Sequence, residues 1–202
     1  MNKMNRGTRN LVNTILSLLV ISVLGGLGYL LFSSGESFVP ESFITAREKS
    51  ASIATELVSD LDLSLQSLVK ISEEDKNGRF SSALELVEQE TEKIEKVRNL
   101  ASNLSGELIN MTQAVQGIEP ASVRNLAFEA VSQEVFLISH LLNYNDFFGR
   151  LLSTLKMKFV DDSKYDSSDV QSFINTMNEE AKTVNSINDS FNQKLKEFDK
   201  AL

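Results

Sequence analysis

The chain lacks several residue types that would carry chemistry. Its 202 residues include no cysteine, no tryptophan, one histidine and two prolines. The absence of cysteine excludes disulfides, thiolate metal sites, covalent haem and a thiol nucleophile. A di-iron bundle needs paired Glu-x-x-His motifs, whereas the residue three before His140 is Leu137. No nucleophile–base pair, metal cluster or phosphate-binding loop is evident, so we expect a protein that is not an enzyme and holds no cofactor or metal.

Acidic residues are absent from the first 32 residues, and this imbalance limits the partners. All 28 acidic residues lie after residue 32, together with 17 of the 20 lysines and arginines, which leaves that part with a net charge of −11. Nucleic acids and anionic lipid surfaces repel a region of this charge. We therefore expect no nucleic-acid partner.

Charge is also absent from the longest apolar run, residues 11–32. A helix of this length crosses a hydrocarbon core of about 30 Å. The three basic residues before it match the positive charge of cytoplasmic flanks. We predict a basic cytoplasmic tail at 1–10, a single-pass transmembrane signal-anchor helix at 11–32 in the plasma membrane, and an extracytoplasmic C-terminal domain. A cleaved signal peptide is the alternative, although its apolar region is usually only about 7–15 residues long.

Small residues in the apolar run indicate where two such helices could meet. Ser22 and Gly26 form a small-xxx-small pair, which lets two helix backbones approach closely. Glycine is also common in membrane helices without such a role. The pair is therefore a candidate packing site for a dimer within the membrane.

The scarcity of proline and the spacing of apolar residues predict long helices after a short linker at 33–40. Apolar positions at alternating steps of three and four residues give a period near 3.5, which is typical of packed or supercoiled helices. We predict an all-α antiparallel up-down-up-down four-helix bundle over 41–202. Two helical hairpins that open into a coiled-coil dimer are the alternative. The expected helices cover residues 41–75, 79–117, 120–159 and 168–202.

Two positions on the apolar seams are acidic, Glu90 and Glu134. A carboxylate that faces an apolar core is costly unless it is paired. Folding the predicted hairpins puts Glu134 level with Lys49, and Glu90 level with Phe148 and Arg150. The first interpretation is an ion pair that sets the helix register, or a carboxylate at the rim of the bundle. The functional alternative is a ligand-binding or proton-sensing site inside the bundle.

One aromatic residue of the third predicted helix, Phe147, lies beside the seam. Its neighbours Tyr144 and Phe148 fall on the seam, so we expect them in the core. Phe147 either widens the buried stripe or anchors a partner surface.

The predicted topology, with an inside N-terminus, one span and a helical bundle, resembles the periplasmic part of a bacterial chemoreceptor. The resemblance is architectural, and no family is assigned. Our first hypothesis is a membrane-tethered, non-enzymatic interaction or scaffold module, whose partner is another envelope protein or a second copy of the chain. The second hypothesis is a ligand-binding or stress-sensing bundle that signals through a membrane partner.

Overall fold

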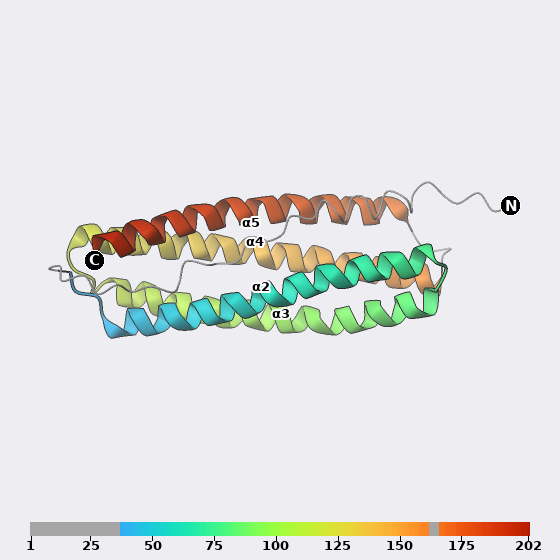
Figure 1. Ribbon diagram of the computed structural model, residues 1–202, viewed down its shortest axis with the longest axis horizontal. Helices are drawn as coiled ribbons and strands as arrows, with labels where there is room; N and C mark the ends of the chain where they lie inside the picture. Colours follow the sequence, from blue (N-terminus) through green and yellow to red (C-terminus); the bar gives the residue numbers. More distant parts are fainter. Residues whose placement is uncertain (1–36, 162–165) are drawn as a thin grey trace. The chain divides into compact units, whose positions relative to one another are not determined.

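The computed structural model describes residues 37–161 and 166–202, and within these ranges the chain is all-α with no strand (Figure 1). Each of the four long helices begins and ends within two residues of its predicted range. The prediction of an all-α four-helix bundle is thereby confirmed. The helices are α2 (Glu41–Lys76), α3 (Phe80–Val115), α4 (Ala121–Val160) and α5 (Ser167–Ala201).

The predicted anchor lies outside the described residues. This applies to residues 11–32, with the pair Ser22 and Gly26, and to the tail at 1–10. Within the described ranges, no helix combines the length and the apolar character that a membrane crossing requires.

The end of α2 follows from its local sequence. Gly78 has a φ of 70°, in the left-handed region that glycine adopts without strain. The N–H of Gly78 donates to the carbonyl of Asp75, and the N–H of Arg79 donates to the carbonyl of Glu74. These two bonds form a Schellman motif, which closes the helix and turns the chain into α3.

The first described residues are fastened to the connection between α3 and α4. Phe38 and Glu119 form an isolated antiparallel bridge with two N–H···O bonds of 2.9 Å. Beside this bridge, a Cβ added to Gly117 would lie 2.8 Å from the side chain of Pro40. Glycine therefore allows the connection to lie directly against the start of α2.

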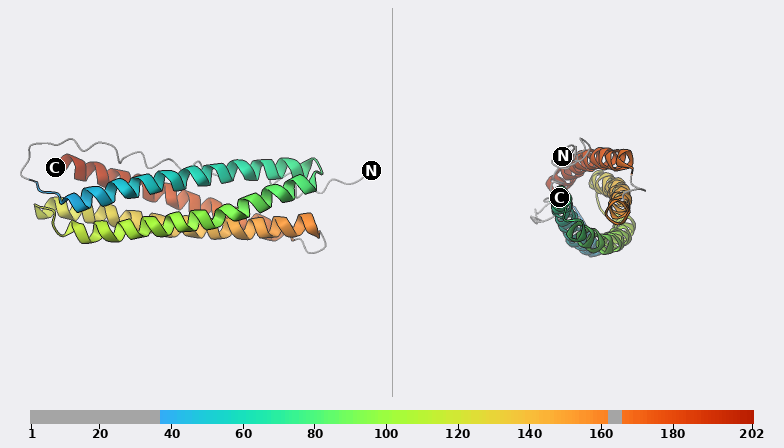
Figure 2. Two further views of the ribbon diagram at one scale, coloured as in Figure 1. Left: turned by 90° about the horizontal axis from the view of Figure 1, so that it is seen from below. Right: turned by 90° about the vertical axis from the view of Figure 1, so that its right-hand side faces the viewer.

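The described residues form two compact units. Unit 1 contains residues 59–98, 142–161 and 166–182, and unit 2 contains residues 37–58, 99–141 and 183–202. Each unit holds a segment of all four helices, and consecutive helices run in opposite directions (Figures 1 and 2).

Ion pairs show the register in which α2 and α3 pack. In unit 1, Lys96 bonds Asp60 at 2.9 Å, and in unit 2 Lys49 lies 3.9 Å from Glu107. The separation of Lys49 and Asp60 along α2 equals the separation of Lys96 and Glu107 along α3. Both units therefore use the same antiparallel register, with charged pairs at the edges of the helix contacts.

Each unit has its own apolar core with a few buried polar side chains. The buried polar residues of unit 1 are Ser64, Ser72, Glu90, Asn145 and Thr154, and those of unit 2 are Arg47, Ser50, Glu134 and Asn188. The most deeply buried large side chains include Leu61, Leu68, Ile71 and Leu151 in unit 1, and Phe43, Leu57, Leu104, Leu108, Ile118, Leu137, Phe191 and Phe198 in unit 2.

Candidate functional site

Glu134 lies in the core of unit 2. It occupies a seam position of α4 and is 1% exposed. Its Oε1 atom is buried without a hydrogen-bond partner. A carboxyl group in such surroundings loses hydration that no protein donor replaces, and this disfavours the charged form. Glu134 is therefore not a carboxylate at the rim of the bundle.

Arg47 of α2 supplies the positive charge near Glu134. Its side chain is 4% exposed, and its guanidinium pairs in a bidentate manner with Asp199 of α5, with N···O distances of 2.8 and 3.0 Å. The same guanidinium lies over the ring of Phe198, 5.7 Å from its centroid. Unit 2 thus holds a fixed cation whose direct bonds go to Asp199, while its charge also acts on Glu134.

The environment of Glu134 brings its titration close to neutral pH. Burial raises the pKa of Glu134 from 4.5 to about 7, and the charge of Arg47 offsets part of this increase. The other charged groups in interhelical pairs of unit 2 are more exposed. They are Lys49 of α2, Glu107 of α3, and Glu129 and Lys194, which pair between α4 and α5. In the described part of unit 2, Glu134 is therefore the carboxyl group whose pKa burial brings close to neutral pH.

Glu90 is buried in unit 1 but has a local partner. It is 1% exposed, and its Oε1 accepts a bond from Lys93 of the same helix at 2.5 Å. The side chain of Lys93 is 44% exposed, so it links the buried carboxylate to the surface. The structure therefore pairs Glu90 within α3, whereas the sequence placed it level with Phe148 and Arg150 of α4.

Phe147 is half-buried at the contact of α4 with α5 in unit 1. Its ring lies 6.4 Å from the ring of Phe173, with an angle of 41° between the planes. The guanidinium of Arg150 covers it at 5.2 Å. Phe147 thus packs against α5 and widens the apolar stripe of unit 1, while part of its side chain remains exposed.

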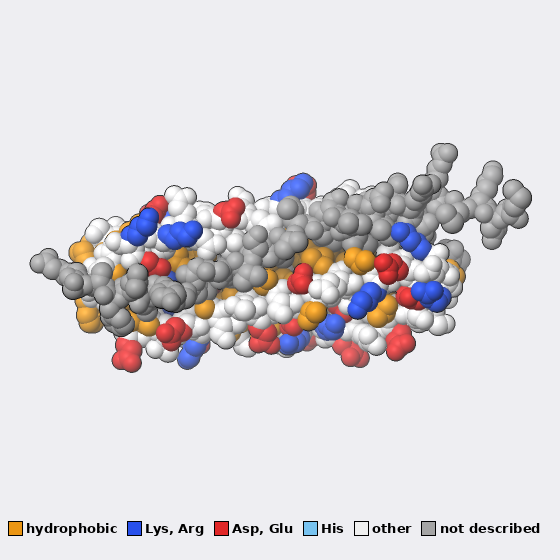
Figure 3. All heavy atoms as spheres, in the orientation of Figure 1, with side chains coloured by type: hydrophobic (Ala, Val, Ile, Leu, Met, Phe, Trp, Pro, Cys, Tyr) orange, Lys and Arg blue, Asp and Glu red, His pale blue; other side chains and the backbone are white. Residues whose placement is uncertain are grey.

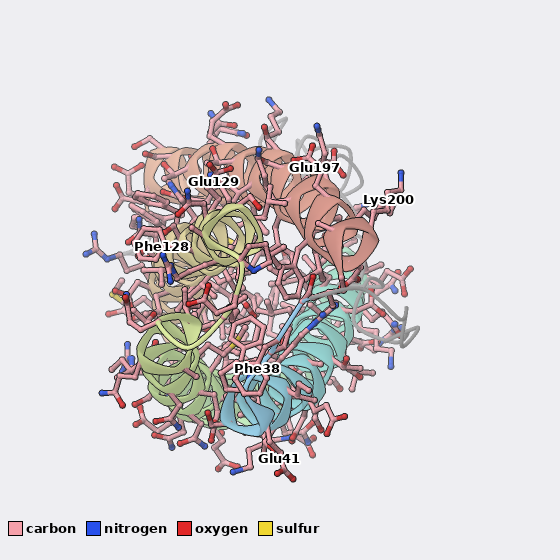
Figure 4. All side chains as sticks on the ribbon, turned by 90° about the vertical axis from the view of Figure 1, so that its left-hand side faces the viewer. Phe38, Glu41, Phe128, Glu129, Glu197 and Lys200 are labelled. Atoms are coloured by element: carbon pink, nitrogen blue, oxygen red, sulfur yellow. The ribbon has the colours of Figure 1, made fainter. Side chains whose placement is uncertain are left out.

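A second feature of unit 2 is a group of exposed apolar side chains on α3 and α4. Ile109, Phe128, Val135 and Phe136 are between 47% and 59% exposed. We call these four residues the apolar patch. Figure 4 shows Phe128 on the outer side of α4 toward α3, whereas Glu129 lies nearer to α5.

The ion pairs of unit 1 show how α3 and α4 align at the apolar patch. Glu88 of α3 bonds Lys156 of α4 at 2.9 Å across the α3–α4 seam. Ile109 lies three heptads after Glu88, and Val135 lies three heptads before Lys156. Because residues a heptad apart share a position in a 3.5-residue repeat, Ile109 and Val135 lie opposite each other across the same seam. An apolar pair in unit 2 therefore occupies the positions of an ion pair in unit 1.

The surface around the apolar patch carries almost no charge. On α4, the exposed residues between 121 and 141 include one charged side chain, Glu129, which bonds Lys194 of α5. Figure 3, by contrast, shows acidic and basic side chains interspersed over the described surface on its side of the molecule. Exposed aromatic residues with few charges are typical of interface cores. On α3, the exposed residues between 99 and 115 are all uncharged, namely Asn99, Ser102, Asn103, Gly106, Ile109, Asn110, Thr112 and Gln113.

The described residues give no indication of metal chemistry. Within residues 37–161 and 166–202, no three histidine, cysteine, aspartate or glutamate side chains are grouped so that they could hold a metal ion. The arrangement can take up a proton at Glu134, and it can bury an apolar surface at the apolar patch. The chain matches no protein-family model, no curated protein and no solved structure.

Two parts of the site were not predicted from the sequence. Arg47 lies seven residues before Ala54, and Ala54 lies seven before Leu61, so extending the apolar heptad of α2 backwards would have placed Arg47 in the core. The apolar patch had a signal as well. Aligning α3 and α4 by heptads sets Ile109 and Val135 against the charged positions of unit 1.

Proposed function

We propose that the chain is a membrane-tethered, non-enzymatic helical interaction module of the cell envelope. Residues 11–32 are its single-pass anchor, and the bundle lies outside the cytoplasm. The observation that supports this proposal most is the apolar patch on a surface with few charges. Single exposed apolar side chains need no explanation, whereas a group with few charges around it marks a surface that a partner covers.

The start of unit 2 supports a position close to the membrane. The bridge between Phe38 and Glu119 fixes the first described residues to unit 2. Only residues 33–36 then separate the predicted anchor from the bundle, and four extended residues span at most about 14 Å. The apolar patch belongs to the same unit, so its partner lies in the same membrane or next to it.

The absence of cysteine allows a direct test of this topology, because each introduced cysteine is the only one in the chain. We would label intact cells with a membrane-impermeant maleimide, using Ser81→Cys at the exposed start of α3 and Asn5→Cys in the basic tail. We expect residue 81 to react in intact cells and residue 5 to react only after lysis. Labelling in the reverse order, or release of the chain from membranes by alkaline carbonate, would contradict the proposal.

A second candidate function is proton sensing by unit 2, with a readout through a membrane partner. The observation in its favour is Glu134, buried beside the fixed charge of Arg47 with its pKa raised to about 7. A core carboxyl group that ionises near neutral pH makes the stability of unit 2 depend on pH in that range. This candidate requires Glu134→Gln to remove a change with pH that the wild-type chain shows, and the stability measurement in the Discussion tests it.

A further inference from the structure

The apolar patch is suited to a second copy of this chain. We propose that two copies in one membrane pair through their apolar patches, with the outer side of α4 in one copy against that of α4 in the other. This inference rests on the proposed function, because it uses the anchor at residues 11–32 to bring the copies together. It adds the identity of the partner and the surface of contact.

Charge favours a second copy over a partner of opposite charge. Each copy carries −11 after residue 32, so two copies repel each other unless they meet where charge is absent. In unit 2, α2 exposes Glu41, Glu48, Lys49 and Glu56, and α5 exposes Asp189, Lys196 and Lys200. A cationic partner would need free carboxylates beside the apolar patch, but Glu129 already bonds Lys194. An uncharged apolar surface is complementary to itself, as a two-fold contact requires.

The size of the surface indicates a contact that depends on the membrane. Residues 128–139 of α4 extend about 18 Å, and two packed helices are about 20 Å wide, so the uncharged surface offers roughly 400 Å² per copy. Stable dimers in solution bury about 800 Å² per partner. Tethering to one membrane raises the effective concentration of a partner, which allows a smaller contact to form. We therefore expect pairing in membranes and separation in dilute detergent.

The apolar run at 11–32 is not a suitable occupant of this surface. A helix of 22 residues is about 33 Å long, and this run is uncharged and largely apolar. A surface about 18 Å long would cover only about half of the length of this helix, and only on one side. Burial in a membrane satisfies the run completely, whereas binding to the apolar patch would leave most of it in water.

The anchor also determines how the two copies would face each other. Two copies in one membrane are parallel, so residues on the outer line of α4 lie level with their counterparts. Ser132 and Ser139 lie on this line in unit 2. Ser132 lies between Phe128 and Phe136, and Ser139 lies about one turn after Phe136. Ser153 lies on the same heptad line in unit 1, close to Arg150 and Lys156. It is a matched control for the position within the helix.

The experiment uses the purified full chain in liposomes of phosphatidylcholine, with one cysteine in each variant. A short bis-maleimide is expected to join Ser132→Cys chains and Ser139→Cys chains into dimers, with a yield at least about tenfold above that of Ser153→Cys. Dilution into detergent should remove this difference. Equal yields at the three positions would indicate random collision and overturn the proposal.

A second variant tests the apolar patch itself and uses an ion pair that the chain already contains. Ile109→Glu with Val135→Lys repeats in unit 2 the pair that Glu88 and Lys156 form in unit 1. We expect the exchange to preserve α3–α4 packing, which circular dichroism and the unfolding temperature check. Added to the Ser132→Cys chain, it should lower the yield to the level of Ser153→Cys. An unchanged yield in the folded variant would contradict pairing through the apolar patch.

Gly26→Leu in the Ser132→Cys chain distinguishes pairing through the membrane helices from pairing through the bundle. We expect dimers to persist, because the contact at residue 132 lies in unit 2. Complete loss with Gly26→Leu, together with an unchanged yield in the Ile109→Glu and Val135→Lys variant, would assign pairing to the anchor and overturn the proposal. Absence of dimers in the purified chain would also overturn it. The maleimide labelling of residues 5 and 81 tests the membrane topology of the proposed function separately.

Discussion

The two units use the same helices and the same register, but they differ in what they bury and in what they expose. In unit 1, the α3–α4 seam carries the ion pair of Glu88 with Lys156, and the buried Glu90 bonds a lysine of its own helix through Oε1, while its Oε2 has no hydrogen-bond partner. In unit 2, the equivalent seam positions hold Ile109 and Val135, and the buried Glu134 leaves an oxygen unpaired. Both units thus share the heptad pattern of core residues, while the residues at the edges of their helix contacts differ.

This difference separates residues that maintain the fold from residues that are available for another role. Unit 1 also keeps buried oxygens without a hydrogen-bond partner, at Glu90 and Asn178, and it exposes single apolar side chains such as Leu63 and Phe80. Unit 2 retains an exposed apolar surface and an unsatisfied carboxyl oxygen, and both are unfavourable in an isolated bundle. What distinguishes unit 2 is the apolar pair at seam positions that hold an ion pair in unit 1, and the buried Glu134 whose pKa is raised to about 7. Such departures from the pattern of the other unit are candidates for function.

The largest effect is expected from the buried cation of unit 2. Arg47→Met removes one partner of the pair with Asp199 and leaves that carboxylate partly buried, at a cost of about 3–5 kcal/mol. It also removes the charge that lowers the pKa of Glu134, so that pKa rises further. Urea unfolding at pH 7 measures the loss. Lys156→Met, which breaks the exposed pair of Lys156 with Glu88 in unit 1, is the control and should cost under about 1 kcal/mol. An equally small cost for Arg47→Met would contradict the role of its pair with Asp199.

The next effect is the dependence of stability on pH. Glu134 has a pKa of about 7 in the folded chain against 4.5 for an unperturbed glutamate, so the folded state binds this proton more tightly. Its contribution is present below pH 4.5 and is lost as the pH rises through about 7, a loss of about 3 kcal/mol. Glu134→Gln should remove this loss and make the chain more stable than wild type at pH 8. The free energy of unfolding between pH 4.5 and 8 tests this, and a constant difference between the two chains would exclude it.

A smaller effect distinguishes two phenylalanines of α4, one in each unit. Phe147→Ala in unit 1 should cost about 2 kcal/mol, because Phe147 is half-buried and packs on Phe173. Phe136→Ala in unit 2 should change stability by less than about 0.5 kcal/mol, because Phe136 is 59% exposed. Thermal unfolding of both variants checks the contrast. Similar losses would mean that Phe136 is held within unit 2 and is not available to a partner.

The smallest effect concerns the seam pair itself. A double-mutant cycle on Glu88 and Lys156 should give a coupling of about 0.2–1 kcal/mol, as expected for an exposed pair. The corresponding cycle in unit 2 compares the wild-type chain, Ile109→Glu alone, Val135→Lys alone and the variant that carries both. An equal coupling in both units would show that the seam geometry is the same, and a coupling of opposite sign would show that it is not.

Much of the fold could be predicted from the sequence, because a period of 3.5 residues fixes which side of each helix faces the core. The end of α2 and the start of α4 follow from Gly78 and Pro120, whose backbone preferences are local. The seam positions Glu90 and Glu134 were recognised as acidic residues on an apolar stripe, and both are 1% exposed. Their partners depend on side-chain geometry, which spacing does not contain. The paired side chain of Glu90 proved to be in its own helix.

The exposed surface was harder to predict for a physical reason. An apolar residue beside a seam has the same pattern whether a neighbouring helix covers it or water does. Phe147 and Phe136 both lie at the edge of the α4 stripe, and they differ in the ring of Phe173 and the guanidinium of Arg150, which lie against Phe147. Burial at such positions is a property of the neighbour and is absent from the helix's own sequence.

The bridge between Phe38 and Glu119 has a mechanical consequence. Its two backbone hydrogen bonds and the contact of Pro40 with Gly117 join the incoming chain to the connection between α3 and α4. A pull on the chain before Phe38 is therefore shared by two helix ends, and it does not act on the first turn of α2 alone. Unit 2 receives such a force at the connection that precedes α4. This helix carries Glu134 and most of the apolar patch.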